Sequence, residues 1–162
     1  MEKASDRPPE GRERSQPGRA LPTEGPLLAI DPGSKRIGLA ISDFTQTVAR
    51  PLATLVRRSG KRFPLRRLRT QLEEHGPVGL LIGLPVAADG SEDVRAEVVR
   101  ALGSTLAAET GLPVVYWDER FTTARALTVL KDLGSDLRDR KHDLDRLAAA
   151  VLLQTFLDSR RQ

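Results

Sequence analysis

Three acidic residues lie at the ends of apolar segments, where an unpaired carboxylate is costly to bury. Asp31 ends the run LLAID, Glu119 follows VVYWD, and Asp145 precedes the apolar stripe of the C-terminal segment. If folding brings the three together, they repel one another and require a cation, and Mg²⁺ or Mn²⁺ is the ion that such oxygen ligands select. Two such ions would activate water and stabilise the leaving oxygen in phosphodiester hydrolysis.

Two of these acids have close competitors for the same role. Asp118 and Glu119 are neighbours, and adjacent residues of a strand face opposite sides of a sheet, so only one of them can easily join the cluster. We favour Glu119 over Asp118. The alternative is that these acids only form an ion pair with Arg120. Near the C-terminus we favour Asp145 over Asp143, because Asp143 suits the N-cap of the last helix.

Basic residues close to the acids are candidates for binding a substrate. Lys35 and Arg36 follow the Pro32-Gly33 turn, and Arg120 follows Glu119 directly. Beside a phosphate site these three side chains are expected to hold the substrate backbone, although solvated turn residues would give the same pattern.

A longer basic segment carries seven cations and no acid within thirteen residues. Its cations are Arg57, Arg58, Lys61, Arg62, Arg66, Arg67 and Arg69. Solvated helix faces normally mix both signs of charge, so we expect contact with a nucleic-acid backbone. Aromatic residues are only 4% of the chain, and recognition should therefore depend on shape and phosphates rather than on sequence.

The elements that must position these residues alternate between strands and helices. Apolar runs predict five strands, at residues 27–31, 37–42, 48–56, 78–84 and 113–117. Apolar periodicity predicts helices over 63–75, over 91–111 with Ser91 as its cap, and over 144–159, and a short one starting at Thr122 or Thr123. The buried stripe expected for the second helix consists of Val94, Val98, Ala101, Leu102 and Leu106. The fold class is therefore α/β, a five-stranded mixed sheet flanked by helices.

Length and composition limit the number of domains, the possible metal ligands and the expected location. The 162 residues suit one domain, no cysteine is present, and the two histidines are too few for a histidine-built metal centre. No signal peptide or membrane segment is evident, so we expect a cytoplasmic protein that binds no membrane. Residues 1–26 hold five cations, five acids and five prolines, and we expect a flexible tail that can be deleted without loss of stability, followed by a domain over 27–162.

Four segments in order resemble the YqgF family of Holliday-junction-resolvase-like proteins, described as pre-16S rRNA nucleases. They are IDPGSKRIGLAISD, LLIGLPVAADGSE, DERFTTARA and KHDLDRLAAAVLLQTFL, within residues 27–158. The resemblance implies a ribonuclease H-like fold, a nuclease site that depends on two Mg²⁺ or Mn²⁺ ions, and catalytic and metal-binding roles for Asp31, Glu119 and Asp145. The family often has threonine at Ser34 and leucine at Phe121, both mild departures.

The leading hypothesis is therefore a nuclease of structured RNA that matures the 5′ end of pre-16S ribosomal RNA. A resolvase of branched DNA is the alternative enzyme, and it would require a two-fold dimer, whereas the sequence suggests a monomer or a weak homodimer. A non-catalytic RNA-binding factor is a third reading. Nucleotide phosphotransfer is the least favoured function. Asp-x-Gly-Ser turns like the one that begins at Asp31 also bind phosphates in sugar kinases, but those folds place two such domains around the nucleotide.

Overall fold

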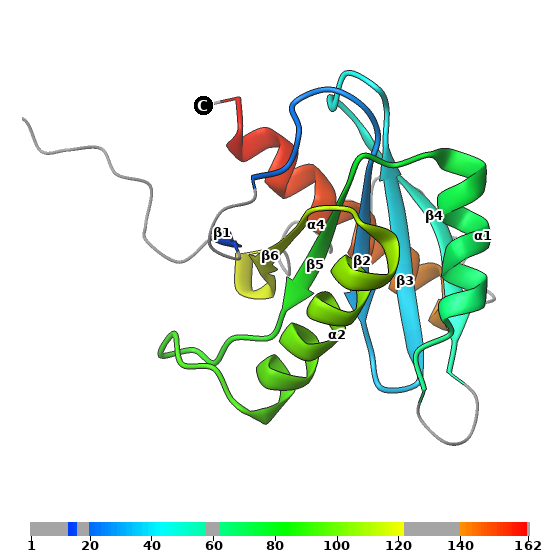
Figure 1. The fold of residues 1–162 in the computed structure, drawn as a ribbon. Helices are drawn as coiled ribbons and strands as arrows, with labels where there is room; N and C mark the ends of the chain where they lie inside the picture. Colours follow the sequence, from blue (N-terminus) through cyan, green and yellow to red (C-terminus); the bar gives the residue numbers. More distant parts are fainter. Residues whose placement is uncertain (1–12, 16–19, 58–61, 122–139, 162) are drawn as a thin grey trace, which may run out of the picture.

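The strands form one mixed sheet of six, in the order β1-β6-β5-β2-β3-β4 (Figure 1). The computed structural model describes residues 13–15, 20–57, 62–121 and 140–161. The strands are β1 (Glu13–Ser15), β2 (Leu27–Pro32), β3 (Arg36–Ser42), β4 (Ala49–Val56), β5 (Gly79–Leu84) and β6 (Val114–Asp118). β2, β3 and β4 form an antiparallel meander, β5 lies parallel to both β2 and β6, and β1 is antiparallel to β6.

The five predicted strands are confirmed, and each boundary agrees with the prediction to within one residue. The sequence predicts β2, β5 and β6 well because continuous apolar runs suit strands that are covered on both faces. The sixth strand, β1, comes from the segment predicted to be a flexible tail.

The helices are α1 (Leu65–His75), α2 (Val94–Thr110) and α4 (Arg140–Ser159), with a short 3₁₀ turn η1 (Glu119–Phe121) after β6. α1 agrees with the predicted helix: Leu68 is buried, Leu65 and Leu72 pack beside it, and Gly76 ends the helix in the left-handed conformation. The helix predicted from Thr122 or Thr123 lies outside the described residues. Among the helices that are described, none is long and apolar enough to cross a membrane.

Each face of the sheet has its own apolar core, because side chains alternate along every strand. α1 and α2 cover one face and α4 covers the other (Figure 1). On β2, Leu28 and Ile30 point toward α1 and α2, whereas Leu27 and Ala29 point toward α4. This alternation decides which face each acid at a strand end can reach.

The buried face of α2 differs from the predicted one. Val94 and Val98 are 70% and 59% exposed. Leu106 is buried and Leu102 packs against the core as predicted, but the other buried residues are Ala96, Val99 and Gly103. Gly103 is needed because a Cβ at this position would collide with the Tyr116 hydroxyl, which donates a hydrogen bond to the Arg100 carbonyl (3.0 Å). A close helix–sheet contact of this kind selects small residues, which carry a weak apolar signal in the sequence.

Two helix starts also differ from the predictions. α2 is capped by Asp93, whose carboxylate accepts from the Arg95 amide (2.9 Å), whereas the predicted cap Ser91 bonds through its hydroxyl to Asp89 (2.6 Å) in the preceding turn. α4 begins at Arg140 rather than at Leu144, so Asp143 lies within the helix and is not its N-cap.

Residues 20–26 pack against the domain, in contrast to the predicted flexible tail over 1–26. Leu21 is only 4% exposed and belongs to the core beneath α4. The Arg160 guanidinium donates to the carbonyls of Leu21 (2.8 Å) and Pro22 (3.1 Å), and the Gln46 amide donates to those of Pro22 (2.9 Å) and Gly25 (3.0 Å). Packing therefore begins before the predicted boundary, since one leucine among polar and proline residues gives little sequence signal.

We accordingly expect deletion of residues 1–26 to destabilise the protein, contrary to the expectation from composition. Leu21→Ala should lower the free energy of unfolding by about 2 kcal/mol, because a buried leucine leaves a cavity when it is truncated. Urea unfolding of wild type, Leu21→Ala and the deletion would measure both effects, with Thr23→Ala at an exposed position as the control. Equal unfolding midpoints for all four proteins would contradict the packing of this segment.

Candidate active site

Asp31 lies on the α4 face of the sheet, near the carboxyl end of the central strand β2. It follows Ala29 by two residues, and Ala29 belongs to the core beneath α4. Its partner across the ladder is Gly38 of β3, which has no side chain to cover it. Sites in open α/β sheets gather at the carboxyl ends of central strands, and Asp31 occupies this position.

Glu119 reaches the same face as Asp31, and Asp118 does not. On β6, Val115 and Trp117 belong to the core beneath α4, so the alternation sends Asp118 to the opposite face. The Glu119 carboxyl forms a side-chain hydrogen bond with Asp31. The structure therefore favours Glu119 over Asp118 as the partner of Asp31.

Asp118 and Arg120 form a clamp on the other face. Asp118 is fully buried, and its carboxylate accepts from the Arg120 backbone amide (2.9 Å) and from the guanidinium at 2.7 to 3.1 Å. The same guanidinium donates to the carbonyls of Ala87 (3.2 Å) and Ala88 (3.3 Å) in the loop after β5. Through these contacts Arg120 connects the end of β6 to the loop after β5. Its guanidinium therefore has a structural role, and the geometry does not support its predicted role in binding substrate.

Asp145 approaches the pair from helix α4. A Cβ at residue 38 would collide with the Asp145 backbone carbonyl, so the glycine at this position allows the helix to lie directly on β3. Its carboxylate is close enough for its charge to act on Asp31. The side chain of the competing Asp143 lies outside the described residues.

The Asp145 carboxylate is held by Arg36. The Nε of Arg36 donates to Oδ2 of Asp145 at 2.7 Å, and both side chains are 30% exposed. Arg36, predicted to contact substrate, is thus engaged with a predicted metal ligand. Lys35, the other predicted cation of this turn, is exposed.

A second glycine makes room for Glu119. A Cβ on Gly83 of β5 would lie 2.8 Å from Oε1 of Glu119 and 3.2 Å from its Cγ. Gly83 and Gly38 belong to the two strands that flank β2, and both are on the α4 face. Small residues on both neighbouring strands therefore allow carboxylates to gather around Asp31.

The electrostatics of the Asp31–Glu119 pair indicate more negative charge than the neighbouring cations balance. Burial raises the pKa of Glu119 to about 8, and the negative charge of Asp31 contributes to this shift. Burial also raises the pKa of Asp31, the charge of Asp145 adds to it, and the hydrogen bond from protonated Glu119 opposes it. At neutral pH Glu119 therefore keeps a proton that it donates to Asp31, and a cation would take the place of that proton.

The three acids do not form a closed metal site in this arrangement. Within residues 13–15, 20–57, 62–121 and 140–161, no three histidine or carboxylate side chains converge on one point. Asp31 and Glu119 share a hydrogen bond, while Asp145 is turned toward Arg36. The donor set of carboxylate oxygens fits Mg²⁺ or Mn²⁺, and Asp145 joins it only if Arg36 releases it.

Sequence reasoning missed one cation and one glycine of this site. Arg95, in the first turn of α2, lies near enough to Glu119 for its charge to oppose the rise of that pKa, and it also pairs with Asp93 (3.2 Å). Gly38 is the second residue of the predicted strand 37–42, and a glycine within a strand indicates a close backbone approach. That signal was available, whereas nothing in the sequence places Arg95 beside Glu119.

We expect Glu119→Gln to stabilise the protein at pH 8 in the presence of chelator. The Glu119 carboxyl has a pKa near 4.5 when exposed and about 8 when folded, so the free energy of unfolding falls as pH rises through this window and levels off above it. A glutamine stays neutral and removes this loss, which is on the order of a few kcal/mol at pH 8, and each kcal/mol corresponds to roughly 2–4 °C in Tm.

Thermal unfolding between pH 5 and 9 would measure this difference, with Glu73→Gln, an exposed glutamate on α1, as the matched control. A wild-type Tm that does not change more across this range than that of Glu119→Gln would contradict the shared proton.

Solved structures of known proteins have a similar arrangement of strands and helices. Thermus thermophilus RuvC in complex with a Holliday junction substrate superposes with a TM-score of 0.53 at 21% identity, over 85% of this chain and 96% of that one. The yeast mitochondrial Holliday junction resolvase Ydc2 gives a TM-score of 0.53 at 12% identity, over 86% and 80%. The fold is therefore ribonuclease H-like, as the sequence motifs imply.

Sequence relatives are closer. The Caulobacter vibrioides protein named "Putative pre-16S rRNA nuclease" is 40% identical over 144 residues, or 88% of this chain and 92% of the relative. A protein of the same name from Paramagnetospirillum magneticum is 40% identical over 134 residues, or 83% and 86%. Residues 25–159 match the family described as RuvX, Holliday junction resolvase. The chain belongs to this RuvX family, which is also called YqgF.

Proposed function

We propose that this protein is a metal-dependent nuclease that hydrolyses phosphodiester bonds in the maturation of the 5′ end of pre-16S ribosomal RNA. The observation that carries the proposal is the largely buried, hydrogen-bonded Asp31–Glu119 pair at the end of the central strand. The family membership and the names of the relatives support the reaction class and the substrate.

Asp31, Glu119 and Asp145 are proposed to hold one or two Mg²⁺ or Mn²⁺ ions. The bound metal supplies activation of water and stabilisation of the leaving oxygen. Asp31 and Glu119 bind it from the sheet, with Glu119 giving up its proton. Asp145 binds it from α4, which requires that Arg36 break its 2.7 Å ion pair with this carboxylate. Arg36, once released, is then available with Lys35 to hold a substrate phosphate on the same turn.

A resolvase activity on branched DNA is the second candidate. The description of the family favours it, and the solved structure of RuvC with its junction shows a protein of this fold on that substrate. Symmetric cleavage of a junction needs two active sites related by a two-fold axis. A monomer or weak homodimer, the state predicted from the sequence, would favour RNA.

Incubation with two substrates distinguishes the candidates. The purified protein is mixed with an rRNA precursor and with a four-way DNA junction, each with Mg²⁺, Mn²⁺ or chelator. Cleavage of the precursor alone supports the maturation nuclease, and paired symmetric cuts in the junction support the resolvase. Binding without cleavage under all metal conditions would leave the third hypothesis, an RNA-binding factor.

The cytoplasmic location of the protein stays a prediction.

Asp31→Asn should abolish cleavage, with a loss of at least about 10³-fold, because it removes a metal-binding charge while keeping the size of the side chain. Nucleic-acid affinity should largely survive, since phosphate contacts come from cations. Single-turnover cleavage and binding in chelator would measure the two effects separately, with Glu73→Gln as the control for removal of one acid. Wild-type cleavage by Asp31→Asn in Mg²⁺ would exclude the carboxylate mechanism.

Arg36→Gln should tighten Mn²⁺ binding roughly two- to fivefold, because it frees Asp145 from a partly exposed ion pair and removes a positive charge beside the site. The same change should weaken nucleic-acid binding. Calorimetric titration of Mn²⁺ into the protein alone would measure the first effect, with Arg50→Gln on the exposed edge strand as the matched control. Unchanged or weaker Mn²⁺ binding would show that Asp145 is not a metal ligand.

A further inference from the structure

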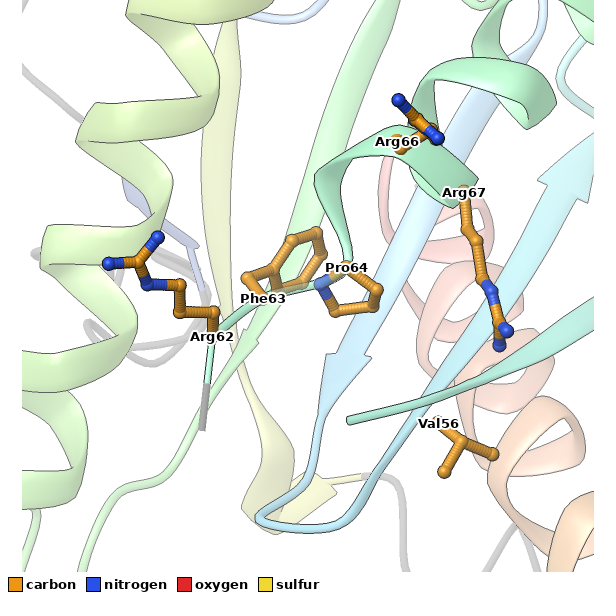
Figure 2. A pocket seen from close by; sticks show the side chains of 6 residues that line it. All are labelled: Val56, Arg62, Phe63, Pro64, Arg66 and Arg67. Carbon is orange, nitrogen blue, oxygen red and sulfur yellow. The ribbon is translucent and has the colours of Figure 1, made fainter. Parts of the chain in front are cut away.

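A pocket of about 320 Å³ lies between the end of β4 and the start of α1. Its lining residues are Val56, Arg62, Phe63, Pro64, Arg66 and Arg67. Figure 2 shows Arg67 extending toward Val56 and Arg62 extending to the opposite side, with the Phe63 ring and Pro64 between them. The pocket therefore has an apolar centre with guanidinium groups around it.

The structure separates the cations of the basic segment into different roles. Arg57 donates through Nε to the Gly33 carbonyl (2.9 Å) and lies over the Phe63 ring at 5.8 Å, so it supports the β2–β3 turn and the pocket wall. Arg69 forms an ion pair with Glu109 of α2 at 2.6 Å. Arg58 and Lys61 lie outside the described residues.

The three arginines of the pocket have no acidic partner among the described residues. In the part of the chain that the structure describes, no carboxylate forms an ion pair with Arg62, Arg66 or Arg67. All three are exposed, and the first turn of α1 contains no acid. An excess of positive charge that the fold leaves unbalanced around a concave surface favours an anionic ligand.

The apolar centre restricts the kind of anion. Val56, Phe63 and Pro64 offer a surface that inorganic phosphate or an acidic side chain would not use, whereas a base or ribose would pack against it. The volume lies at the lower end of the range for ligand pockets, which suits one nucleotide unit. A second pocket, beside Glu73, Glu109 and the paired Arg69, mixes both signs of charge and has no comparable preference.

The pocket opens at the same end of the sheet as the carboxylate pair. Val56 pairs with Arg36 across the β3–β4 ladder, and the Arg57 amide donates to the Lys35 carbonyl (2.9 Å). The acids lie on the α4 face and the pocket on the α1 face, with the β2–β3 turn between them. A nucleic-acid strand that crosses this end of the sheet can therefore reach both the carboxylate pair and the pocket.

We propose that this pocket binds one nucleotide of the substrate strand at a distance from the cleaved bond, with its base or ribose on Phe63 and with Arg62, Arg66 and Arg67 contacting its phosphate and those of the adjoining nucleotides. The proposal rests on the proposed function in one respect, namely that the ligand is a nucleic acid. It adds a second point of contact, which would fix the position of the strand relative to Asp31.

Binding in chelator tests the pocket without requiring cleavage. Fluorescence anisotropy would compare wild type, the triple variant Arg62→Gln/Arg66→Gln/Arg67→Gln, and a control triple variant Arg50→Gln/Arg69→Gln/Arg161→Gln with the same net charge. The pocket variant should bind single-stranded RNA roughly tenfold or more weakly, and the slope of log K against log salt should become shallower by about 0.7 for each phosphate that is no longer neutralised. The control should change by less than about threefold.

Phe63→Leu tests the apolar centre while keeping its packing on the core. This variant should bind RNA about three- to tenfold more weakly and should bind inorganic polyphosphate, which has no bases, as wild type does. The triple pocket variant should bind both ligands more weakly. Circular dichroism melts of all variants would show whether each is folded at the temperature of the assay.

Three results would overturn the proposal. Equal decreases of affinity in the two triple variants would mean that total charge alone decides binding, and unchanged salt slopes would mean that the arginines do not contact phosphate. Wild-type RNA affinity of folded Phe63→Leu would exclude a bound nucleotide. A failure of the proposed nuclease function is distinguishable, since it would appear as absence of cleavage in Mg²⁺ and Mn²⁺ while the differences in binding persist.

Discussion

The contact between Gly38 of β3 and the Asp145 carbonyl of α4 is the constraint on which the site depends. Any side chain at residue 38 would push the helix away from the sheet, and the Asp145 carboxylate would move with it. The same glycine lies beside Asp31 in the ladder, so a single missing Cβ both admits the helix and uncovers the acid. The arrangement of the three acids is therefore set by backbone packing, and their mutual repulsion is relieved by the proton that Glu119 keeps and by the ion pair of Asp145 with Arg36.

Two arginines manage the charge that this packing creates. Arg120 neutralises the fully buried Asp118 and ties the end of β6 to the loop after β5, which orients the neighbouring Glu119. Arg36 neutralises Asp145 but is partly exposed, so this pair can exchange with solvent or with a ligand at little cost. The pair around the buried Asp118 carboxylate thus fixes the end of β6 on the face covered by α1 and α2, whereas the Arg36–Asp145 pair on the α4 face, in which both side chains are 30% exposed, can rearrange.

The sequence predicts the core strands and helix α1, because runs of β-branched and leucine residues, and leucines repeated every three or four residues, are strong local signals. It also favours Glu119 over Asp118, and the structure places Glu119 beside Asp31, whereas the preference for Asp145 over Asp143 stays a prediction because the Asp143 side chain lies outside the described residues. It does not predict the buried face of α2, where Ala96 and Gly103 pack closely and the larger Val94 and Val98 face solvent. Nor does it predict that Arg36 pairs with Asp145 or that Leu21 is buried, since each contact joins residues far apart in the chain. Close approach and long-range pairing leave little trace in local periodicity.

The antiparallel pairing of Glu13–Ser15 with β6 places a short strand beside the strand that leads into Asp118 and Glu119. Without it, β6 would be an edge with a row of unpaired amides and carbonyls, which is a template for strand addition by another molecule. The opposite edge, β4, carries Pro51 and the exposed Arg50, and both discourage such pairing. The N-terminal segment thus covers the backbone of β6 at this edge, and the strand that leads into Asp118 and Glu119 has a hydrogen-bonded neighbour on both sides.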